Sequence, residues 1–290
     1  MKRKKNEMRI ALCQMRVEEN KANNLQKARE MLRRSAEAQA ELAILPEMFN
    51  CPYDRAYFTA YAEPETGETL SMLSAAAKVE GIWIVGGTIP QFSADRRIYN
   101  TCSVLNSQGQ VVADYQKIHL FDVDLGDEAR FTESATFAPG HKVVVFTCGR
   151  VRIGLGICYD LRFPELSRLL SLRGADLIIF PSAFTRVTGE AHWELLLRAR
   201  AVDNQVFIAG VSSAPNPEVS FQAYGHSMVV DPWGKVEASL GDEEEILIVD
   251  IDLEKVARIR RELPLLAHRR TDLYRVSECW RFQGGEDGND

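Results

Sequence analysis

The sequence predicts an α/β fold that combines parallel and antiparallel strands, and three observations support this prediction. Short apolar runs typical of buried strands alternate with segments whose apolar residues recur at helical spacing. Segments 8–15, 20–40 and 42–45 form a β-α-β pattern, which requires a parallel strand pair and a helix that covers the sheet. Strands 98–105 and 110–115 are joined by Asn-Ser-Gln-Gly, a sequence that favours an antiparallel hairpin.

The other expected elements follow the same patterns along the chain. Further helices are expected at 69–79, 164–172, 190–202 and 254–262. Further strands are expected at 82–85, 143–146, 151–157, 176–181, 205–211, 226–230, 235–238 and 245–251. Residues 50–54 read as a loop, and the polar stretch 122–140 reads as a long irregular loop, a feature that is usually functional or disordered.

The chain reads as one domain. Its 290 residues show no linker, repeat or break in composition, so we expect a single domain over 8–280 with flexible termini at 1–7 and 281–290. A net charge of −6 argues against a nucleic-acid surface, and the basic run at 2–5 reads as a solvated terminus. No apolar run approaches the roughly 18 residues that span a membrane, and no signal peptide follows the basic start.

The cysteines and histidines are not arranged as metal or disulfide sites. The six cysteines contain no C-x-x-C pair and lie mostly within apolar runs, which is typical of free thiols in a reducing compartment. The five histidines lack the spacing of a zinc site. We therefore expect a cytoplasmic protein with no metal site and no cofactor.

Three titratable residues end apolar strands: Glu47, Lys117 and Cys158. Each alone has an ordinary explanation, as a solvated loop charge, a surface lysine or a small core cysteine. Together they supply a nucleophile, a base and a cation for an oxyanion. Cys158 also precedes a predicted helix, whose N-terminal N–H groups are expected to favour a thiolate.

A cysteine–histidine pair is the competing nucleophilic scheme. The candidate bases are His119, His192 and His226. His119 lies two residues after Lys117, so an extended chain would place both side chains on one side. Composition and spacing alone do not separate the two schemes.

Three short motifs carry a resemblance to a known family. They read Leu45-Pro-Glu47-Met-Phe49, Tyr115-Gln-Lys117-Ile-His-Leu-Phe121 and Gly156-Ile-Cys158-Tyr-Asp160. In their order and chemistry they resemble the Glu-Lys-Cys motifs of the nitrilase, or carbon–nitrogen hydrolase, superfamily. The resemblance extends from about residue 8 to about residue 275.

This resemblance implies a four-layer α-β-β-α sandwich with two mixed β-sheets that forms a homodimer or a higher even oligomer. It implies that Cys158 is the nucleophile of a thiol amidase and Glu47 the general base. Lys117 and the backbone N–H of Tyr159 would stabilise the oxyanion, and Glu133 would help to hold the lysine and to position the substrate. Burial is expected to raise the pKa of Glu47, while the charge of Lys117 opposes the rise.

Within the superfamily the sequence is most similar to omega-amidases, which deamidate 2-oxoglutaramate and 2-oxosuccinamate. Pro46–Tyr53, Gly86–Pro90 and His119–Asp124 carry this similarity. Amidases of deaminated glutathione and N-carbamoyl hydrolases share several of these features and stay open as alternatives. A scaffold that only binds a partner is the non-enzymatic alternative.

A carboxylated amide also needs a partner for its carboxylate. Arg186, in the loop after the strand at 176–181, is one candidate. Arg162 is another, although it could instead form a structural pair with Asp160. The expected pocket walls are Tyr53, Phe121 and Phe184, although buried aromatic residues are more often plain core.

Overall fold

The structure, a computed structural model, describes residues 6–124, 126 and 130–279. The basic run at 2–5 and the predicted flexible segment 281–290 lie outside the described residues. Glu7, predicted to belong to a flexible terminus, is instead the first residue of strand β1 (Glu7–Gln14) and pairs with Asp252.

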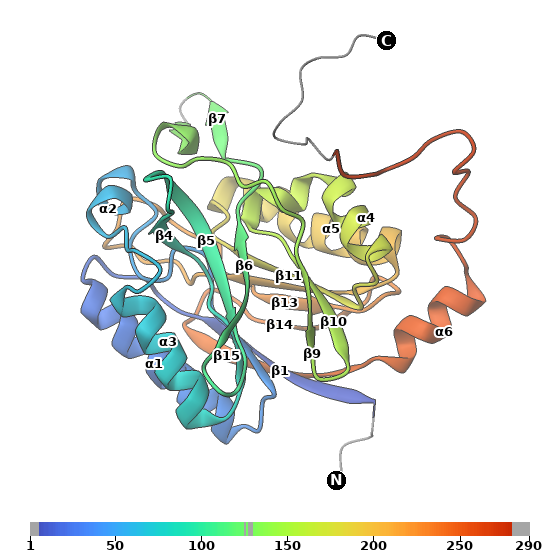
Figure 1. Cartoon of the computed structure of the whole chain (residues 1–290), viewed down its shortest axis with the longest axis horizontal. Coiled ribbons are helices and arrows are strands. Elements are labelled where there is room, and N and C mark those ends of the chain that lie inside the picture. The colour runs from blue at the N-terminus through green and yellow to red at the C-terminus, as the bar shows by residue number, and fades with distance from the viewer. Residues whose placement is uncertain (1–5, 125, 127–129, 280–290) are drawn as a thin grey trace.

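Two large β-sheets form the centre of the fold (Figure 1). The first has the order β15-β1-β2-β3-β5-β4, with β6 also paired to β5. Its other strands are β2 (Leu42–Ile44), β3 (Trp83–Val85), β4 (Ile89–Phe92), β5 (Ile98–Leu105), β6 (Val111–Gln116) and β15 (Glu245–Asp252). The second has the order β14-β13-β12-β11-β10-β9. Its strands are β9 (Val145–Cys148), β10 (Val151–Leu155), β11 (Leu177–Ser182), β12 (Phe207–Ser212), β13 (Met228–Val230) and β14 (Val236–Ser239).

Both sheets are mixed, as predicted. Strands β1, β2 and β3 pair in parallel, and so do β10, β11 and β12. The flanking strands pair antiparallel, including the predicted hairpins β5–β6 and β9–β10. Parallel pairing brings the carboxyl ends of neighbouring strands to one edge of a sheet, where α/β proteins bind ligands.

Helices cover the outer faces of the two sheets (Figure 1). Helices α1 (Lys21–Glu37) and α3 (Glu68–Glu80) pack on the first sheet, and α4 (Pro164–Leu172) and α5 (Arg186–Asn204) pack on the second. The alternation in β1 matches these layers. Ile10 and Leu12 belong to the core between the sheets, whereas Ala11 and Cys13 pack under α1 and α3. The fold is the predicted four-layer α-β-β-α sandwich, with helix α6 (Glu254–Glu262) following the last strand.

Several short elements were not predicted. Helix α2 (Arg55–Ala60) has six residues, too few for a periodic pattern. Asp54 caps its N-terminus, because the Asp54 carboxylate accepts a bond from the Ala56 N–H at 2.9 Å. Strands β7 (Asp122–Asp124) and β8 (Arg130–Thr132) form a hairpin within the stretch predicted to be irregular. Helix α5 begins at residue 186 rather than 190, so Arg186 lies in a helix and not in a loop.

The six cysteines are all free thiols, and five of them are buried. Every helix in the described ranges is too short or too polar to cross a lipid bilayer.

Candidate active site

Glu47, Lys117 and Cys158 meet between the two sheets. Glu47 follows β2, Lys117 follows β6 and Cys158 follows β10, where it opens the five-residue 3₁₀ helix η2 (Cys158–Arg162). All three side chains are buried, and those of Glu47 and Lys117 are fully enclosed. Three segments distant in the chain thus form one buried polar cluster, as their positions at strand ends predicted.

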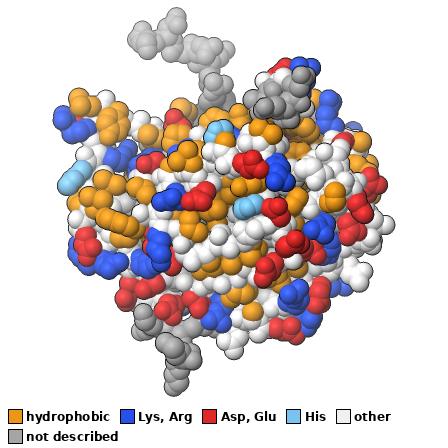
Figure 2. Space-filling model, turned by 180° about the vertical axis from the view of Figure 1, so that it is seen from behind, with side chains coloured by type: hydrophobic (Ala, Val, Ile, Leu, Met, Phe, Trp, Pro, Cys, Tyr) orange, Lys and Arg blue, Asp and Glu red, His pale blue; other side chains and the backbone are white. Residues whose placement is uncertain are grey.

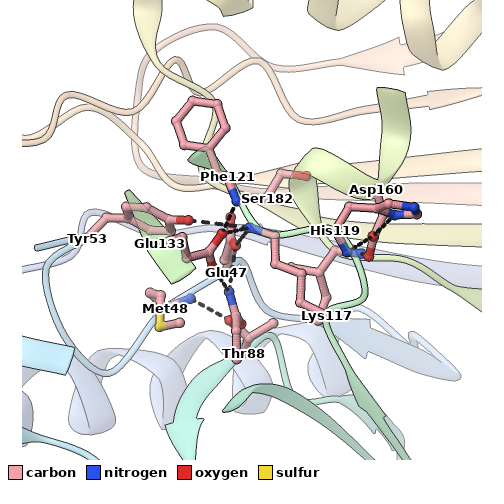
Figure 3. Close-up of polar contacts among 12 residues, drawn as sticks. Glu47, Met48, Tyr53, Thr88, Lys117, His119, Phe121, Glu133, Asp160 and Ser182 are labelled. Carbon is pink, nitrogen blue, oxygen red and sulfur yellow. Dashed lines mark hydrogen bonds and ion pairs between the residues drawn. The ribbon is translucent and has the colours of Figure 1, made fainter. Parts of the chain in front are cut away.

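The Lys117 ammonium lies between two carboxylates. Its Nζ is 2.9 Å from Glu47 Oε1 and 2.8 Å from Glu133 Oε2, and it lies 3.4 Å from the Tyr53 hydroxyl (Figure 3). Burial alone would lower the pKa of Lys117, but the charges of Glu133 and Glu47 raise that pKa well above its ordinary value. The lysine therefore stays a cation, as an oxyanion partner must.

Glu133 binds both the Lys117 ammonium and the backbone at Phe121. It opens the short 3₁₀ helix η1 (Glu133–Ala135) and is fully buried. Its Oε2 accepts the Phe121 N–H at 2.6 Å, in addition to the Lys117 ammonium. Its Oε1 accepts a bond from Asn100 Nδ2 at 3.0 Å. Both oxygens are thus engaged, which suits a carboxylate that orients other groups.

Glu47 differs from Glu133 because, within the part of the chain that the structure describes, hydrogen bonds reach only one of its oxygens. Oε1 accepts bonds from Lys117 Nζ and from Asn100 Nδ2 at 2.8 Å. Oε2 is buried and has no hydrogen-bond partner among the described residues. Burial raises the pKa of Glu47, the Lys117 charge opposes the rise, and the Glu133 charge adds to it. The predicted direction is confirmed, and it suits a carboxyl group that exchanges protons.

Burial also controls the thiol. Cys158 is 5% exposed, and burial together with the charge of Glu47 raises its pKa well above that of an ordinary thiol. The predicted preference for a thiolate at the helix N-terminus is therefore wrong for the resting site. These two effects outweigh the opposing charge of Lys117 and a hydrogen bond from the backbone of Ala183. Cys158 needs a neighbouring base before it can act as a nucleophile.

The turns that carry the base and the thiol contain strained backbone. Cys158 has φ +46° and Met48 has φ +50°, backbone angles that residues other than glycine rarely adopt. Each turn is held by a side-chain acceptor: Thr88 Oγ1 accepts the Met48 N–H at 2.9 Å, and Asp160 Oδ2 accepts the Ile157 N–H at 2.8 Å. Such strain persists only where surrounding contacts enforce it, and it is common at active sites.

Asp160 ties the cysteine turn to the lysine segment. Besides the Ile157 N–H, its carboxylate accepts a bond from the Tyr115 hydroxyl at 2.7 Å. It also accepts the His119 N–H at 3.0 Å and lies 2.7 Å from His119 Nδ1 (Figure 3). The alternative pairing of Arg162 with Asp160 is wrong, because these other groups surround the carboxylate.

The three candidate histidines have other partners. The His119 ring pairs with Asp160 and stacks on Phe163 with ring centroids 3.6 Å apart. His192 Nδ1 lies 3.2 Å from Arg162, and His226 Nδ1 lies 2.8 Å from a backbone carbonyl. Of the two schemes left open by the sequence, the geometry favours a glutamate beside the thiol.

A narrow cavity opens beside the thiol. Its lining includes Phe121, Cys158, Tyr159, Arg162, Phe184 and Thr188. The Arg162 guanidinium lies over the rings of Phe184 and Tyr159, 5.1 and 5.8 Å from their centroids. Of the residues predicted to bind substrate, this cavity thus brings together Tyr159, Phe121, Phe184 and Arg162.

Tyr53 and Arg186 occupy other places. Tyr53 lines a second narrow cavity, which Glu47 also lines, and its hydroxyl lies 3.4 Å from Lys117 Nζ. Arg186 lines a wider outer groove, where its side chain is 69% exposed and pairs with Glu190 at 3.0 Å. Between the two predicted arginine candidates, only Arg162 lines the cavity that contains Cys158.

Asn100 is a site residue that sequence reasoning missed. It lies in the middle of β5, a strand whose other positions are mostly apolar, and it is fully buried. A polar residue inside a buried strand was the available signal, since such a group requires partners. Those partners come from two other segments and were not visible in the sequence.

A four-layer sandwich with this buried cluster defines a class of protein: an enzyme that hydrolyses carbon–nitrogen bonds other than peptide bonds. The family model described as carbon–nitrogen hydrolase matches residues 9–261. The chain belongs to this family, within the nitrilase superfamily.

Relatives with assigned names cover nearly the whole chain. Omega-amidase NIT2 of Mus musculus is 47% identical over 268 residues, which are 92% of this chain and 97% of the relative. Omega-amidase NIT2 of Homo sapiens is 46% identical with the same coverage of both chains. The solved structure of Saccharomyces cerevisiae Nit3, a member of branch 10 of the nitrilase superfamily, matches with a TM-score of 0.84 at 40% identity. That match covers 91% of this chain and 97% of Nit3.

Proposed function

We propose that this protein is an omega-amidase that hydrolyses the terminal amide of 2-oxoglutaramate or 2-oxosuccinamate to a 2-oxo acid and ammonia. The observation that carries the proposal is the buried Glu47–Lys117–Cys158 cluster beside a small cavity with one arginine. The likeness to omega-amidases over 92% of the chain supports the same substrate class.

The first half of the reaction forms a thioester. The Cys158 thiol gives its proton to Glu47, and the sulfur attacks the amide carbonyl carbon. The oxyanion that forms is stabilised by the Lys117 ammonium and the Tyr159 N–H. Glu47 then protonates the amide nitrogen, the C–N bond breaks, and ammonia leaves.

The second half returns the enzyme to its resting state. A water molecule gives a proton to Glu47 and attacks the thioester carbonyl, with the same two groups stabilising the oxyanion. The C–S bond breaks, the 2-oxo acid leaves, and Cys158 recovers its proton from Glu47. One carboxyl group thus acts alternately as base and acid, which requires the raised pKa of Glu47.

Arg162 is the cation that receives the far carboxylate of the substrate. It lines the same cavity as Cys158, and an arginine fork binds a carboxylate through two parallel hydrogen bonds. Phe121 and Phe184 form walls of that cavity, while Tyr53 lies on the side of Glu47.

Replacing Arg162 with methionine is expected to raise the KM for 2-oxoglutaramate by about 10- to 100-fold, the value of a hydrogen bond to a charged group. Hydrolysis of an uncharged amide such as propionamide should change much less. Arg186→Met is the matched comparison and should leave both reactions within about twofold, because Arg186 lies in the outer groove. A larger effect of Arg186 than of Arg162 on KM would reverse the assignment.

The substrate class is tested by measuring ammonia release across a panel. We expect 2-oxoglutaramate and 2-oxosuccinamate to give the highest kcat/KM, with one 2-oxo acid formed per ammonia. Preference for deaminated glutathione would instead indicate that related amidase, and release of carbon dioxide with ammonia would indicate an N-carbamoyl hydrolase. Absence of turnover on every substrate would favour a partner-binding scaffold.

We also propose that the protein is a cytoplasmic homodimer or a higher even oligomer. Large apolar side chains such as Leu195 on α5 and Trp233 before β14 are each 65% exposed. Figure 2 shows apolar side chains in patches between charged ones on one face of the molecule, a pattern typical of interaction surfaces. Five buried free thiols suit a reducing compartment. Light scattering should give an even multiple of the 32.6 kDa of one chain.

A further inference from the structure

The Asn100 side chain joins the two carboxylates of the site through one nitrogen atom. Its Nδ2 donates to Glu47 Oε1 at 2.8 Å and to Glu133 Oε1 at 3.0 Å. Its backbone carbonyl accepts the Lys117 N–H at 2.9 Å. Asn100 therefore contacts the base, the backbone of the lysine and the carboxylate that holds the lysine, all without exposure to solvent.

The contacts fix the orientation of this amide. A flipped side chain would place its oxygen against two carboxylate oxygens, which repel it. With the nitrogen facing both carboxylates, Oδ1 is buried and has no hydrogen-bond partner among the described residues. An unpaired buried acceptor is destabilising, and side chains with such a defect are typical of functional sites.

The two oxygens of Glu47 are made unequal by this arrangement. Lys117 and Asn100 both donate to Oε1, and two charge-assisted bonds withdraw its lone pairs from proton transfer. Oε2 keeps its lone pairs free inside the buried cluster. Lys117 alone does not restrain Glu47 fully, because its ammonium also binds Glu133 and lies at the end of a flexible side chain.

We propose that Asn100 is a positioning residue that holds Glu47 by Oε1, so that Oε2 is the oxygen that exchanges the proton with Cys158. The inference rests on the proposed function, since it concerns the base of the same reaction. A hydrogen bond donated to a carboxylate also favours its charged form, so the Asn100 bond opposes the effect of burial on the Glu47 carboxylate.

The test measures how fast iodoacetamide alkylates Cys158 as a function of pH, in the wild type and in Asn100→Leu. Leucine has a similar size and donates no hydrogen bond. We expect the acidic limb of this pH profile to move upward by about one pH unit. The kcat/KM for 2-oxoglutaramate at pH 7 should fall by about 10- to 100-fold. Mass spectrometry of the peptide that contains Cys158 separates its reaction from that of exposed Cys279.

Two further variants make the outcome decisive. Asn100→Asp keeps the size, loses the donor and adds a negative charge, so its acidic limb should move further upward than that of the leucine variant. Thr101→Val is the neighbouring control, because the Thr101 hydroxyl makes only a 3.4 Å bond within its own strand. Its profile should match the wild type.

Each result has one meaning. An unchanged acidic limb in both folded Asn100 variants would overturn the inference, and so would wild-type kcat/KM in Asn100→Leu. If the leucine variant fails to fold by circular dichroism, Asn100→Asp alone carries the same comparison. Alkylation requires no substrate, so a wild type that ignores 2-oxoglutaramate would refute the proposed function while the pH profiles still test Asn100.

Discussion

Replacing Cys158 with alanine is expected to lower kcat for 2-oxoglutaramate by at least about 10⁴-fold, while the protein stays folded. No thioester can form without the sulfur, and the remaining Lys117 and Glu47 can only assist direct attack by water. The removed side chain is small and lies at a cavity, so the fold tolerates its loss. Ammonia release and thermal unfolding measured on the same preparation check both parts of this expectation.

Cys148→Ala is the matched control for this variant. Cys148 is also buried, lies in β9 and has a thiol pKa raised by burial to about 12. The Cys148→Ala variant should lose some stability and keep its kcat, because Cys148 is not among the residues of the polar cluster. If Cys158→Ala retained more than about a hundredth of the wild-type kcat, the thioester mechanism would be untenable.

Replacing Glu47 with glutamine is expected to lower kcat by about 10³-fold. Glutamine keeps the size of the side chain and still accepts the Lys117 bond, but it cannot take the proton from the thiol. The Cys158 pKa, which burial raises, leaves almost no thiolate at neutral pH without this base. Steady-state ammonia release gives the magnitude.

The pH dependence follows from the same carboxyl group. A general base is active only when deprotonated, so activity falls as the pH drops through its pKa. Burial raises the pKa of Glu47 above its ordinary value of 4.5, so the acidic limb of kcat/KM should lie above pH 4.5. A wild-type limb at or below this value would mean that Glu47 does not carry the essential proton.

The three reacting residues were predictable because each one ends an apolar run. Such a run predicts a buried strand, and a titratable residue directly after it lies at a sheet edge. Glu47 and Cys158 follow the buried strands β2 and β10, whereas β6 before Lys117 is largely exposed, so what the three residues share is a position after a strand end.

The supporting residues were less predictable because their roles depend on three-dimensional partners. Asn100 acts through hydrogen bonds to residues 33 and 53 positions away in the chain. Asp160 acts through a hydrogen bond to a residue 45 positions away. The sequence offered Arg186 as a candidate and Arg162 as another with a structural pairing to Asp160 as its alternative. Only the folded chain directs Arg162 to the cavity of Cys158 and Arg186 to the outer groove. The pKa of the thiol likewise depends on burial, which a local sequence does not reveal.

The most direct test of the account is to titrate the enzyme with iodoacetamide and follow two quantities together. One is the fraction of Cys158 that is alkylated, and the other is the remaining rate of ammonia release from 2-oxoglutaramate. We predict that the two fall in a one-to-one relation and that 2-oxoglutarate slows both. Ammonia release that persists after Cys158 is fully alkylated would contradict the claim that this thiol attacks the amide.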